Sequence, residues 1–444
     1  MAKCGVTGRR LTRGRHVDCD GLTMNFLPLD IGASHPATEQ AVTREDGHMR
    51  IAFVASAMPR RCGIATFTGD LVAAVKSADP TVRVHQVAID EPSAARAYGP
   101  EVRWRIQQEE PDSYREAALE INDSTVDIVN IQHEFGLYGV WHDGVYDDHL
   151  AVFLDALEKP SVTTLHTVPP QPDQWLRAAV RAVSEKSDVL VVMAHTAAQL
   201  LRDVYGITKE PVVIEHGMPA IEPHGRHRLK RQLGVQDRQI VSTFGLVDPR
   251  KGLEYVIEAM PEIVRAHPSS LYLIVGQTHP ELLKKQGEAY RNSLVDVVHT
   301  MGVTGHVKFV NEYLTQRQIV DYLLASDVYV TPYLDPNQIT SGTLAYALGA
   351  GKAIVSTPYL HAREVLSEGR GILVPFRDAP AIAEAVTSIL SNPGAKQRLE
   401  MRAYEYGKEM AWPAIGRRVL ALMRDVLDAR EAAPAPHAER ALLP

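Results

Sequence analysis

The sequence predicts an α/β protein made of two doubly wound halves, each a parallel sheet covered by helices on both faces. Three observations support this prediction. Short, nearly continuous apolar runs alternate with helical segments from about residue 49 onward. The alternation is interrupted once, over residues 218–239, and then starts again. Apolar runs without regular polar alternation are typical of strands buried on both faces, as in parallel sheets.

The composition is that of an ordinary globular protein and excludes several classes of function. The 444 residues, of which 45% are hydrophobic and 23% charged, are enough for two or three domains. The net charge of -7 does not favour a nucleic-acid partner, and the folded region has no basic patch. No apolar run reaches the roughly 18 residues that predict a transmembrane helix. The three scattered cysteines, with no signal-peptide core, indicate a reducing, cytoplasmic location.

The first half is expected to form an N-terminal Rossmann-like domain over residues 49–217. It is preceded by residues 1–48, which are polar, basic and aperiodic and predict a disordered or loosely attached extension. A wrongly assigned start, with Met24 or Met49 as the true one, is the alternative. The expected strands of this half are 49–56, 82–89, 126–134, 161–167, 188–194 and 211–217, and its expected helices include 64–78, 111–122 and 195–206.

The second half is expected to form a C-terminal Rossmann-like domain over residues 218–411. A polar linker with a short helix opens it, and a helix over 251–267 follows the first strand. An amphipathic helix over 412–430 and a solvated tail over 431–444 complete the chain. The expected strands of this half are 240–245, 270–278, 306–313, 327–333, 353–359 and 371–376.

Ligands of such sheets bind beyond the carboxyl ends of the strands, so the residues after each strand are the candidates. After the first strand, Arg61 and Gly63 open a helix, where amides and the helix dipole favour an anion; an ordinary turn with solvated arginines is the alternative. His133 and Glu134 begin a polar loop that we expect to line the cleft, and no familiar metal-ligand spacing occurs there. His166 ends another strand, where it is either structural or functional.

In the second half, "FGLVDPRKG" follows the first strand. It carries Gly245, and it places Arg250 and Lys251 at a helix start, where a diphosphate would relieve the unfavourable cations. The stretch "QITSGTLAYALGAGK" follows a later strand and opens a helix with amides suited to phosphate, at Ser341, Gly342 and Thr343. It is not a P-loop, and no GxGxxG follows the first strand, so an NAD enzyme is not expected.

These pieces resemble, in order, the retaining glycosyltransferases of family four, the group 1 glycosyl transferases, over about residues 49–428. The resemblance is carried by "RIAFVAS", "TTLHT", "VVIEHGM", "FGLVDPRKG", "LIVGQT", "HVKFVNEYLT" and "ALGAGKAIVST". Each match alone is weak, and their common order carries the argument. The resemblance implies the GT-B fold, in which two Rossmann-like domains face a cleft and the final helix crosses back to the first domain.

The resemblance also implies a mechanism. A nucleotide-diphosphate sugar would lie in the second domain as a substrate, with no cofactor and no metal, and the acceptor would enter from the first domain. Cationic side chains and helix amides would stabilise the leaving diphosphate. Lys251 and Arg250 would hold the phosphates, and His166 would contact the sugar or acceptor near the anomeric centre. Arg61, Gly63, His133 and Glu134 would lie on the acceptor side.

The chain departs from the family pattern at three positions. The family carries two glutamates, one for the donor sugar and one for the ribose, and the alignment places Gln338 and Tyr346 there. Gln338 can still bind sugar hydroxyls, whereas the single hydroxyl of Tyr346 replaces a carboxylate poorly. The arginine of the family's phosphate loop falls on Leu246, and Arg250 is the nearby substitute.

The sequence therefore predicts a retaining hexosyltransferase, with GDP-mannose or UDP-glucose as donor. A retaining glycoside phosphorylase on the same scaffold and a non-catalytic nucleotide- or sugar-binding protein are the two alternatives. The expected acceptor is a soluble sugar or small molecule. Peripheral membrane contact stays open, a nucleic-acid partner is not expected, and the sequence does not give the oligomeric state.

Overall fold

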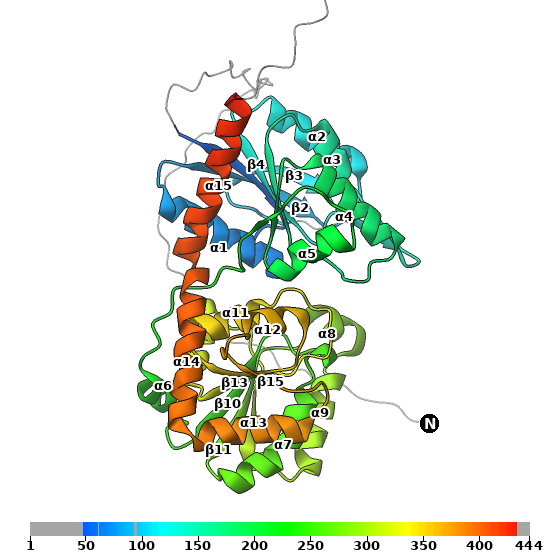
Figure 1. Cartoon of the computed structure of the whole chain (residues 1–444). Coiled ribbons are helices and arrows are strands. Elements are labelled where there is room, and N and C mark those ends of the chain that lie inside the picture. Colours follow the sequence, from blue (N-terminus) through cyan, green and yellow to red (C-terminus); the bar gives the residue numbers. More distant parts are fainter. Residues whose placement is uncertain (1–47, 61, 93–95, 433–444) are drawn as a thin grey trace, which may run out of the picture. The chain divides into compact units, whose positions relative to one another are not determined.

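The computed structural model describes residues 48–60, 62–92 and 96–432 (Figure 1). The predicted N-terminal extension and the predicted C-terminal tail lie almost entirely outside these described residues. The rest of the chain forms two parallel sheets with helices on their faces (Figure 1). This is the α/β class that the alternation of apolar runs predicts.

The first sheet has the strand order β3-β2-β1-β4-β7-β8-β9, and every neighbouring pair of strands in it is parallel. The chain order reverses between β1 and β4, which makes their carboxyl ends the switch point where ligands bind in such sheets. The strands are β1 (Arg50–Ala55), β2 (Arg83–Asp90), β3 (Val102–Gln107), β4 (Ile128–His133), β7 (Ser161–Leu165), β8 (Val189–Val192) and β9 (Val212–Val213).

Both faces of this sheet are buried, as its sequence pattern predicts. Ile51 and Phe53 of β1 point into one apolar cluster, and Ala52 and Val54 point into another on the opposite face. Alternate residues of a strand face opposite ways, so both sets must be apolar when helices cover both faces. The helices of this half are α1 (Gly63–Ala78), α2 (Pro111–Asn122), α3 (Leu150–Ala156), α4 (Gln174–Lys186) and α5 (His195–Asp203).

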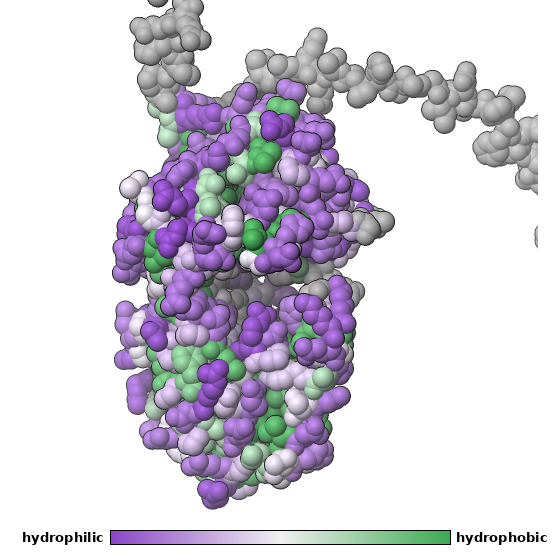
Figure 2. All heavy atoms as spheres, turned by 90° about the vertical axis from the view of Figure 1, so that its right-hand side faces the viewer, coloured by the Kyte–Doolittle hydropathy of each residue, from purple (hydrophilic) through white to green (hydrophobic). Residues whose placement is uncertain are grey.

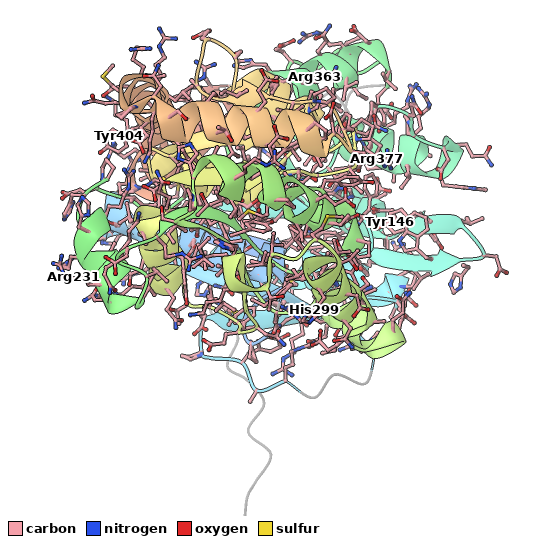
Figure 3. All side chains as sticks on the ribbon, turned by 90° about the horizontal axis from the view of Figure 1, so that it is seen from below. Tyr146, Arg231, His299, Arg363, Arg377 and Tyr404 are labelled. Carbon is pink, nitrogen blue, oxygen red and sulfur yellow. The ribbon has the colours of Figure 1, made fainter. Side chains whose placement is uncertain are left out.

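Three features of the first half differ from the expectation. The edge strand β3 was not predicted, because its alternating pattern lacks a continuous apolar run. The last strand, β9, is only two residues long. The loop predicted after β4 contains an antiparallel hairpin of β5 (Gly139–His142) and β6 (Val145–Asp148), which extends outward past Tyr146 (Figure 3).

The second sheet has the strand order β12-β11-β10-β13-β14-β15 and is parallel throughout. Its switch point lies between β10 and β13, so the ends of these strands are the second expected binding place. The strands are β10 (Gln239–Phe244), β11 (Ser270–Val275), β12 (Val307–Val310), β13 (Val328–Thr331), β14 (Ala353–Ser356) and β15 (Ile372–Leu373).

The helices of the second half again cover both faces of their sheet. Two apolar clusters, one containing Ile240 and the other Val241, receive alternate residues of β10. The α-helices are α6 (Arg226–Gln232), α7 (Leu253–Ala266), α8 (Pro280–Gln286), α9 (Ala289–Thr300), α10 (Gln316–Ala325), α11 (Gly342–Gly349), α12 (Leu360–Val365), α13 (Ala379–Ser391) and α14 (Pro393–Gly407), and the 3-10 helices are η1 (Pro249–Lys251), η2 (Thr304–His306) and η3 (Lys408–Met410).

The final helix, α15 (Trp412–Ala432), returns to the first half, as expected for GT-B proteins. It lies beside α1 (Figure 1), and Trp412 and Ile415 join the apolar cluster of the first sheet that contains Phe67. Gly416 allows the close approach, because a Cβ there would lie 2.5 Å from the carbonyl oxygen of Ala74 in α1.

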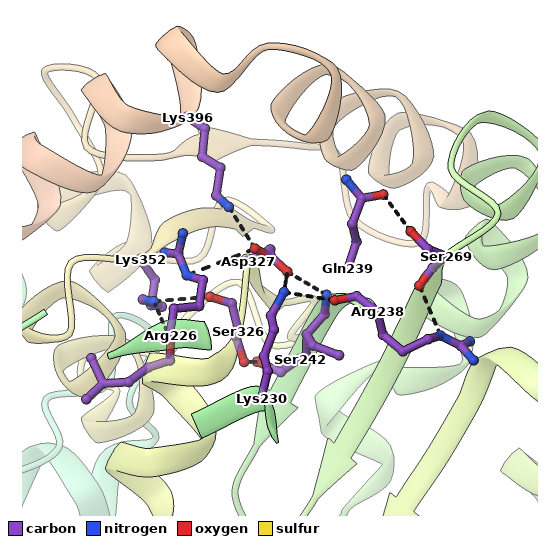
Figure 4. A network of polar contacts seen from close by, with 12 residues as sticks. Arg226, Lys230, Arg238, Gln239, Ser242, Ser269, Ser326, Asp327, Lys352 and Lys396 are labelled. Carbon is purple, nitrogen blue, oxygen red and sulfur yellow. Dashed lines mark hydrogen bonds and ion pairs between the residues drawn. The ribbon is translucent and has the colours of Figure 1, made fainter. Parts of the chain in front are cut away.

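A buried charge network fixes the base of the second half (Figure 4). Asp327, at the start of β13, accepts hydrogen bonds from Lys230 of α6 (2.5 Å) and Lys396 of α14 (2.9 Å). Despite its burial, the pKa of Asp327 is lowered to about 2 by these lysines. Lys352, before β14, is 1% exposed and donates to the carbonyl oxygen of Ser326. Breaking such a buried pair costs about 3–5 kcal/mol.

The face drawn in Figure 2 is mostly hydrophilic, with hydrophobic residues in small separate groups. Among the described residues, no helix combines the length and the apolar character needed to cross a bilayer.

Candidate functional site

A cavity of about 450 Å³ lies where α1 of the first half meets the strand ends of the second half. Its walls include Phe244 and Val275, at the ends of β10 and β11, and Asp70, in α1. Leu314 and Tyr346 contribute from the segment after β12 and from α11. The cavity thus lies at the carboxyl ends of β10 and β11, on one side of the switch point between β10 and β13, and its volume suits a small organic ligand.

The N-terminus of α11 borders this region and is prepared for an anion. The Ser341 hydroxyl accepts a hydrogen bond from the Leu344 amide (3.3 Å), and the Ser341 amide donates to Nδ1 of His361 (3.0 Å). Among the described residues, no acceptor is found for the amides of Gly342 and Thr343. Two such amides at the positive end of a helix dipole form a favourable phosphate site.

Lys251 is brought to this place by a rigid turn after β10. Asp248 caps η1 by accepting from the Arg250 amide (2.9 Å), and the Lys251 amide donates to the Asp248 carbonyl (2.9 Å). Gly252 follows with φ +61°, and a Cβ there would lie only 2.3 Å from the carbonyl oxygen of Pro332. Only glycine fits that position, which explains the "RKG" ending of the turn.

The ammonium of Lys251 is linked to α11 through Tyr333. Its Nζ lies 3.7 Å from the centre of the Tyr333 ring. The Tyr333 hydroxyl is 2.6 Å from the Thr343 hydroxyl, which is in turn 3.1 Å from that of Ser341. Burial opposes ionisation of Tyr333, but the nearby ammonium nevertheless lowers the pKa of this phenol. A positive charge and free helix amides therefore share one small region.

Gly245 completes this group on the side of β10. It has φ +122°, and a Cβ there would lie 3.2 Å from Cγ2 of Thr343, so the turn after β10 packs closely on the start of α11. The structure thus brings together five residues predicted as nucleotide-binding. They are Gly245, Lys251, Ser341, Gly342 and Thr343.

Arg250 and Gln338 lie apart from the cavity wall. The guanidinium of Arg250 pairs with Asp248 in the same turn (2.9 Å), and its side chain is 75% exposed. Gln338 lies in the loop before α11, where its side-chain amide donates to the Thr340 carbonyl (3.0 Å). In this conformation each is held by its own loop.

In the first half, His166 follows β7 and is almost fully buried. Its Nε2 lies 2.8 Å from Oε1 of Gln132, and the Gln132 amide nitrogen donates to Asn130 (2.5 Å) and Thr164 (3.4 Å). This network assigns the amide oxygen of Gln132 to His166, so Nε2 carries the proton and Nδ1 is an acceptor. Burial lowers the pKa of His166 to about 3. The imidazole is therefore neutral at physiological pH.

The other predicted acceptor-side residues have different surroundings. Glu134 follows β4, accepts from the Thr167 hydroxyl (2.8 Å), and has a pKa raised by burial. His133 is 0% exposed and pairs with Asp148 of the hairpin (3.0 Å), so its side chain offers no surface to an acceptor in this conformation. Gly63 begins α1, with open space around it. Arg61 lies outside the described residues.

Two histidines that the sequence did not single out also lie at this junction. A Cβ on Gly342 would lie 3.0 Å from Nε2 of His216, which follows the last strand of the first half. His361, in α12, has no partner for its buried Nε2 among the described residues. Burial lowers the pKa of both, that of His361 to about 4. Each of these two histidines follows a strand by a few residues in the sequence. The same kind of position, at the end of a strand, is what identified His166.

Tyr346 forms the end of a polar chain across the cavity. Nε2 of Gln316 donates both to the Tyr346 hydroxyl (3.1 Å) and to Oδ2 of Asp70 (3.1 Å). All three residues line the cavity, and Asp70 comes from the opposite half of the chain. Burial raises the pKa of Tyr346 to about 12, so the phenol stays protonated. Gln316 and Asp70 were not predicted, because only the fold brings them to Tyr346.

Among the described residues, no group of three or more His, Cys, Asp and Glu side chains is arranged to hold a metal ion. The polar groups of the site include an ammonium, helix amides, neutral hydrogen-bonding side chains and the carboxylate of Asp70.

Comparison with known proteins shows which proteins this chain resembles. Residues 226–410 match the family described as Glycosyl transferases group 1. A GDP-mannose-dependent alpha-(1-6)-phosphatidylinositol monomannoside mannosyltransferase of Mycolicibacterium smegmatis is 24% identical over 58% of this chain and 67% of its own length. A D-inositol 3-phosphate glycosyltransferase of Kineococcus radiotolerans is 24% identical over 56% of this chain and 60% of its own length.

Another relative is matched over less of its length. A phosphatidyl-myo-inositol mannosyltransferase of Mycolicibacterium smegmatis is 26% identical over 40% of this chain and 43% of its own length. The chain thus spans between 43% and 67% of these three relatives.

Solved structures confirm the fold. The sucrose-phosphate synthase of Thermosynechococcus elongatus has a TM-score of 0.67 at 18% identity, covering 86% of this chain and all of its own. Anabaena HepE, solved with UDP and glucose, has a TM-score of 0.65 at 16% identity, covering 85% of this chain and all of its own. The predicted GT-B architecture of two facing Rossmann-like sheets is therefore confirmed.

Proposed function

Because residues 226–410 match the family of the group 1 glycosyl transferases and the chain has the GT-B fold, we propose that it transfers a hexose from a nucleotide-diphosphate sugar to a carbohydrate or small-molecule acceptor. The family match and the named relatives confirm the predicted enzyme class, a glycosyltransferase. The observation that carries the finer proposal is the 450 Å³ cavity beside Lys251 and the start of α11.

The diphosphate of the donor binds at the start of α11. The amides of Gly342 and Thr343 and the ammonium of Lys251 supply hydrogen bonds and positive charge to its oxygens. The same groups stabilise the charge that develops on the leaving diphosphate as the glycosidic bond breaks. The proposed reaction therefore needs no metal, because protein groups fixed by the fold perform the neutralisation.

The nucleoside part of the donor fills the cavity, whose apolar wall of Phe244, Val275 and Leu314 suits a flat base. We place GDP-mannose first and UDP-glucose second as donors. One relative is named as GDP-mannose-dependent, and one structural neighbour was solved with UDP and glucose. Gln338 would reach the donor sugar only after its amide leaves the Thr340 carbonyl, and Arg250 would reach the phosphates only by leaving Asp248.

On the acceptor side, His166 is a neutral acceptor of hydrogen bonds. With its proton held on Nε2 by Gln132, its Nδ1 can accept from a sugar hydroxyl near the anomeric carbon. Glu134 lies close to this position, because the His166 amide donates to the carbonyl of the adjacent His133 (3.0 Å) and the Thr167 hydroxyl donates to Glu134 (2.8 Å). We propose retention of configuration, with the leaving phosphate taking the acceptor proton.

The proposal includes a soluble acceptor and a cytoplasmic site of action, for which the widely spaced cysteines are the support. The acceptor surface is the carboxyl end of the first sheet, where Glu134, His166 and Thr167 lie together.

The test is direct. The purified chain is screened by thermal shift against GDP, UDP, ADP, TDP and inorganic phosphate, with EDTA present. We expect one nucleoside diphosphate to raise the melting temperature and its hexose conjugate to be turned over. Stabilisation by phosphate alone would support a glycoside phosphorylase instead, for which the large apolar cavity has no use. Binding of a diphosphate with no turnover of any conjugate would support a non-catalytic protein.

A further inference from the structure

The described residues that line the cavity include one partly buried carboxylate, and it comes from the half opposite the phosphate site. Asp70 lies in the second turn of α1, and its Oδ2 accepts from Gln316 (3.1 Å). The other carboxylate of the cavity wall, Glu312, is exposed to solvent. A carboxylate retained in a partly apolar cavity without a cationic partner in its hydrogen-bond chain costs folding free energy, which suggests a role in binding.

Burial raises the pKa of Asp70, although donors of Trp412 and Gln316 oppose the shift. An ionised carboxylate accepts hydrogen bonds and donates none. Its ligand must therefore supply hydroxyl or N–H donors. Two vicinal hydroxyls can each donate to one of its two oxygens, whereas a single hydroxyl or amide can donate to only one of them.

The position of Tyr346 along α11 indicates which part of the nucleotide Asp70 would contact. Tyr346 stands four residues after Gly342, which is about one helical turn, or roughly 5.4 Å, from the amides of the phosphate site. Gln316 joins Tyr346 to Asp70 by two hydrogen bonds of 3.1 Å. Ligand groups near these hydrogen-bonded side chains therefore lie about the length of one sugar ring from the phosphate. The apolar part of the cavity, formed by Phe244 and Leu314, is then available to the base.

We propose that Asp70, held by Gln316, binds the ribose hydroxyls of the donor from across the cavity and so replaces the missing ribose carboxylate of α11. This inference rests on the proposed function, because it assumes a nucleoside diphosphate at the start of α11. Its consequence is that the ribose contacts both halves of the chain, whereas the phosphates contact only the second.

The test is a binding cycle that changes both partners. Dissociation constants are measured calorimetrically for GDP and for 2′,3′-dideoxy-GDP, with UDP and its dideoxy form in parallel. The proteins are the wild type, Asp70→Asn and Glu312→Gln. Asn keeps the shape of Asp and an oxygen that can accept from Gln316, so folding is preserved, and thermal melting checks this. Glu312→Gln is the matched control, since it removes the other carboxylate of the cavity wall.

For the wild type we expect loss of the ribose hydroxyls to weaken binding about tenfold or more, as for a hydrogen bond to a charged group. Asp70→Asn should weaken GDP binding by a similar factor and then show little further loss with dideoxy-GDP. The control should keep the full hydroxyl penalty. A full hydroxyl penalty in Asp70→Asn would overturn the inference while leaving the proposed function intact. If the wild type binds neither GDP nor UDP, the proposed function itself fails.

Discussion

The carboxyl ends of the two sheets present different kinds of polar groups. In the first half, burial keeps His166 neutral and raises the pKa of Glu134, and both side chains are held by neighbouring polar groups. In the second half, the Lys251 ammonium stands on the Tyr333 ring near a helix N-terminus that carries two amides without described acceptors.

This difference supports the proposed placement of the two substrates. A diphosphate needs positive charge and N–H donors, which the second half offers at its strand ends through Lys251 and the start of α11. Sugar hydroxyls need fixed, neutral acceptors and donors, which the first half offers. The assignment follows from the protonation states and hydrogen bonds of the two strand ends and agrees with the order expected for a GT-B enzyme.

The largest effect is expected in the first half. His166→Ala should lower kcat by at least about a hundredfold, the scale of a positioned acid–base or hydrogen-bonding group in a transition state. The affinity for a nucleoside diphosphate should stay within about twofold, because the ring has no charge to offer a phosphate. Steady-state kinetics and calorimetry on the same preparation measure both. A large loss of diphosphate affinity with kcat unchanged would reverse the assignment of the two halves.

The next effect belongs to the second half. Lys251→Ala should weaken binding of GDP or UDP by about ten- to a hundredfold, since a hydrogen bond to a charged group contributes about 1.5–3 kcal/mol. Lys308→Ala is the matched control, because it removes the same charge from an exposed position on β12. Equal weakening in both variants would show that overall charge, and not the local site, attracts the nucleotide.

A smaller effect is expected at the helix start. Gly342→Ala would place a Cβ 3.0 Å from Nε2 of His216, so either the ring or the first turn of α11 must shift by a few tenths of an ångström. We expect a loss of diphosphate affinity of about three- to tenfold with little change in melting temperature. Gly305→Ala, in η2, has open space around it and serves as the control. An unchanged dissociation constant for Gly342→Ala would place the phosphates elsewhere.

A separate effect, on stability and not on ligand affinity, concerns the charges beneath the second sheet. Burial lowers the pKa of Lys352 to about 7; Arg226 and Lys396 lower it further, and Glu400 and Asp327 oppose them. An unfolded lysine has a pKa of about 10.4, so between about pH 7 and 10.4 the unfolded chain binds more protons at this position than the folded one. The stability that wild-type Lys352 contributes therefore rises with pH across this window, and below it the full penalty applies.

The measurement compares wild type with Lys352→Met by urea unfolding at several pH values between 7 and 10. As pH rises, the unfolding free energy of the wild type should increase relative to that of Lys352→Met, by up to about 1.4 kcal/mol per pH unit. Parallel curves for the two proteins would mean that Lys352 keeps an ordinary pKa when folded.

Much of the fold was predictable from local pattern. Strands buried on both faces, such as β1 and β11, leave apolar runs that need no knowledge of their neighbours. The edge strand β3 was missed because Arg103 and Arg105 alternate with buried residues, and an isolated alternating run of that length competes with a loop. The hairpin β5–β6 was missed because each of its strands has only four residues and half of these are not hydrophobic.

The candidate site was predictable where it depends on local turns. The glycine of "RKG" adopts a left-handed φ, which glycine favours, and the hydroxyl of the serine before α11 caps that helix. Both roles can be predicted from the local sequence. Asp70 was not predictable, because it reaches the site from an element far away along the chain. His216 and His361 each follow a strand by a few residues, but that position alone did not single them out. Their contribution depends on how the elements pack, which no local pattern records.

The central claim is that the second half binds a nucleoside diphosphate through Lys251 and the start of α11, and the most direct test is calorimetric titration of GDP and UDP. The wild type and Lys251→Ala are compared in EDTA at low ionic strength. The account predicts a measurable dissociation constant for one nucleotide with the wild type and at least a tenfold weaker one with Lys251→Ala. Equal affinity of both proteins, or no binding of either nucleotide to the wild type, would contradict it.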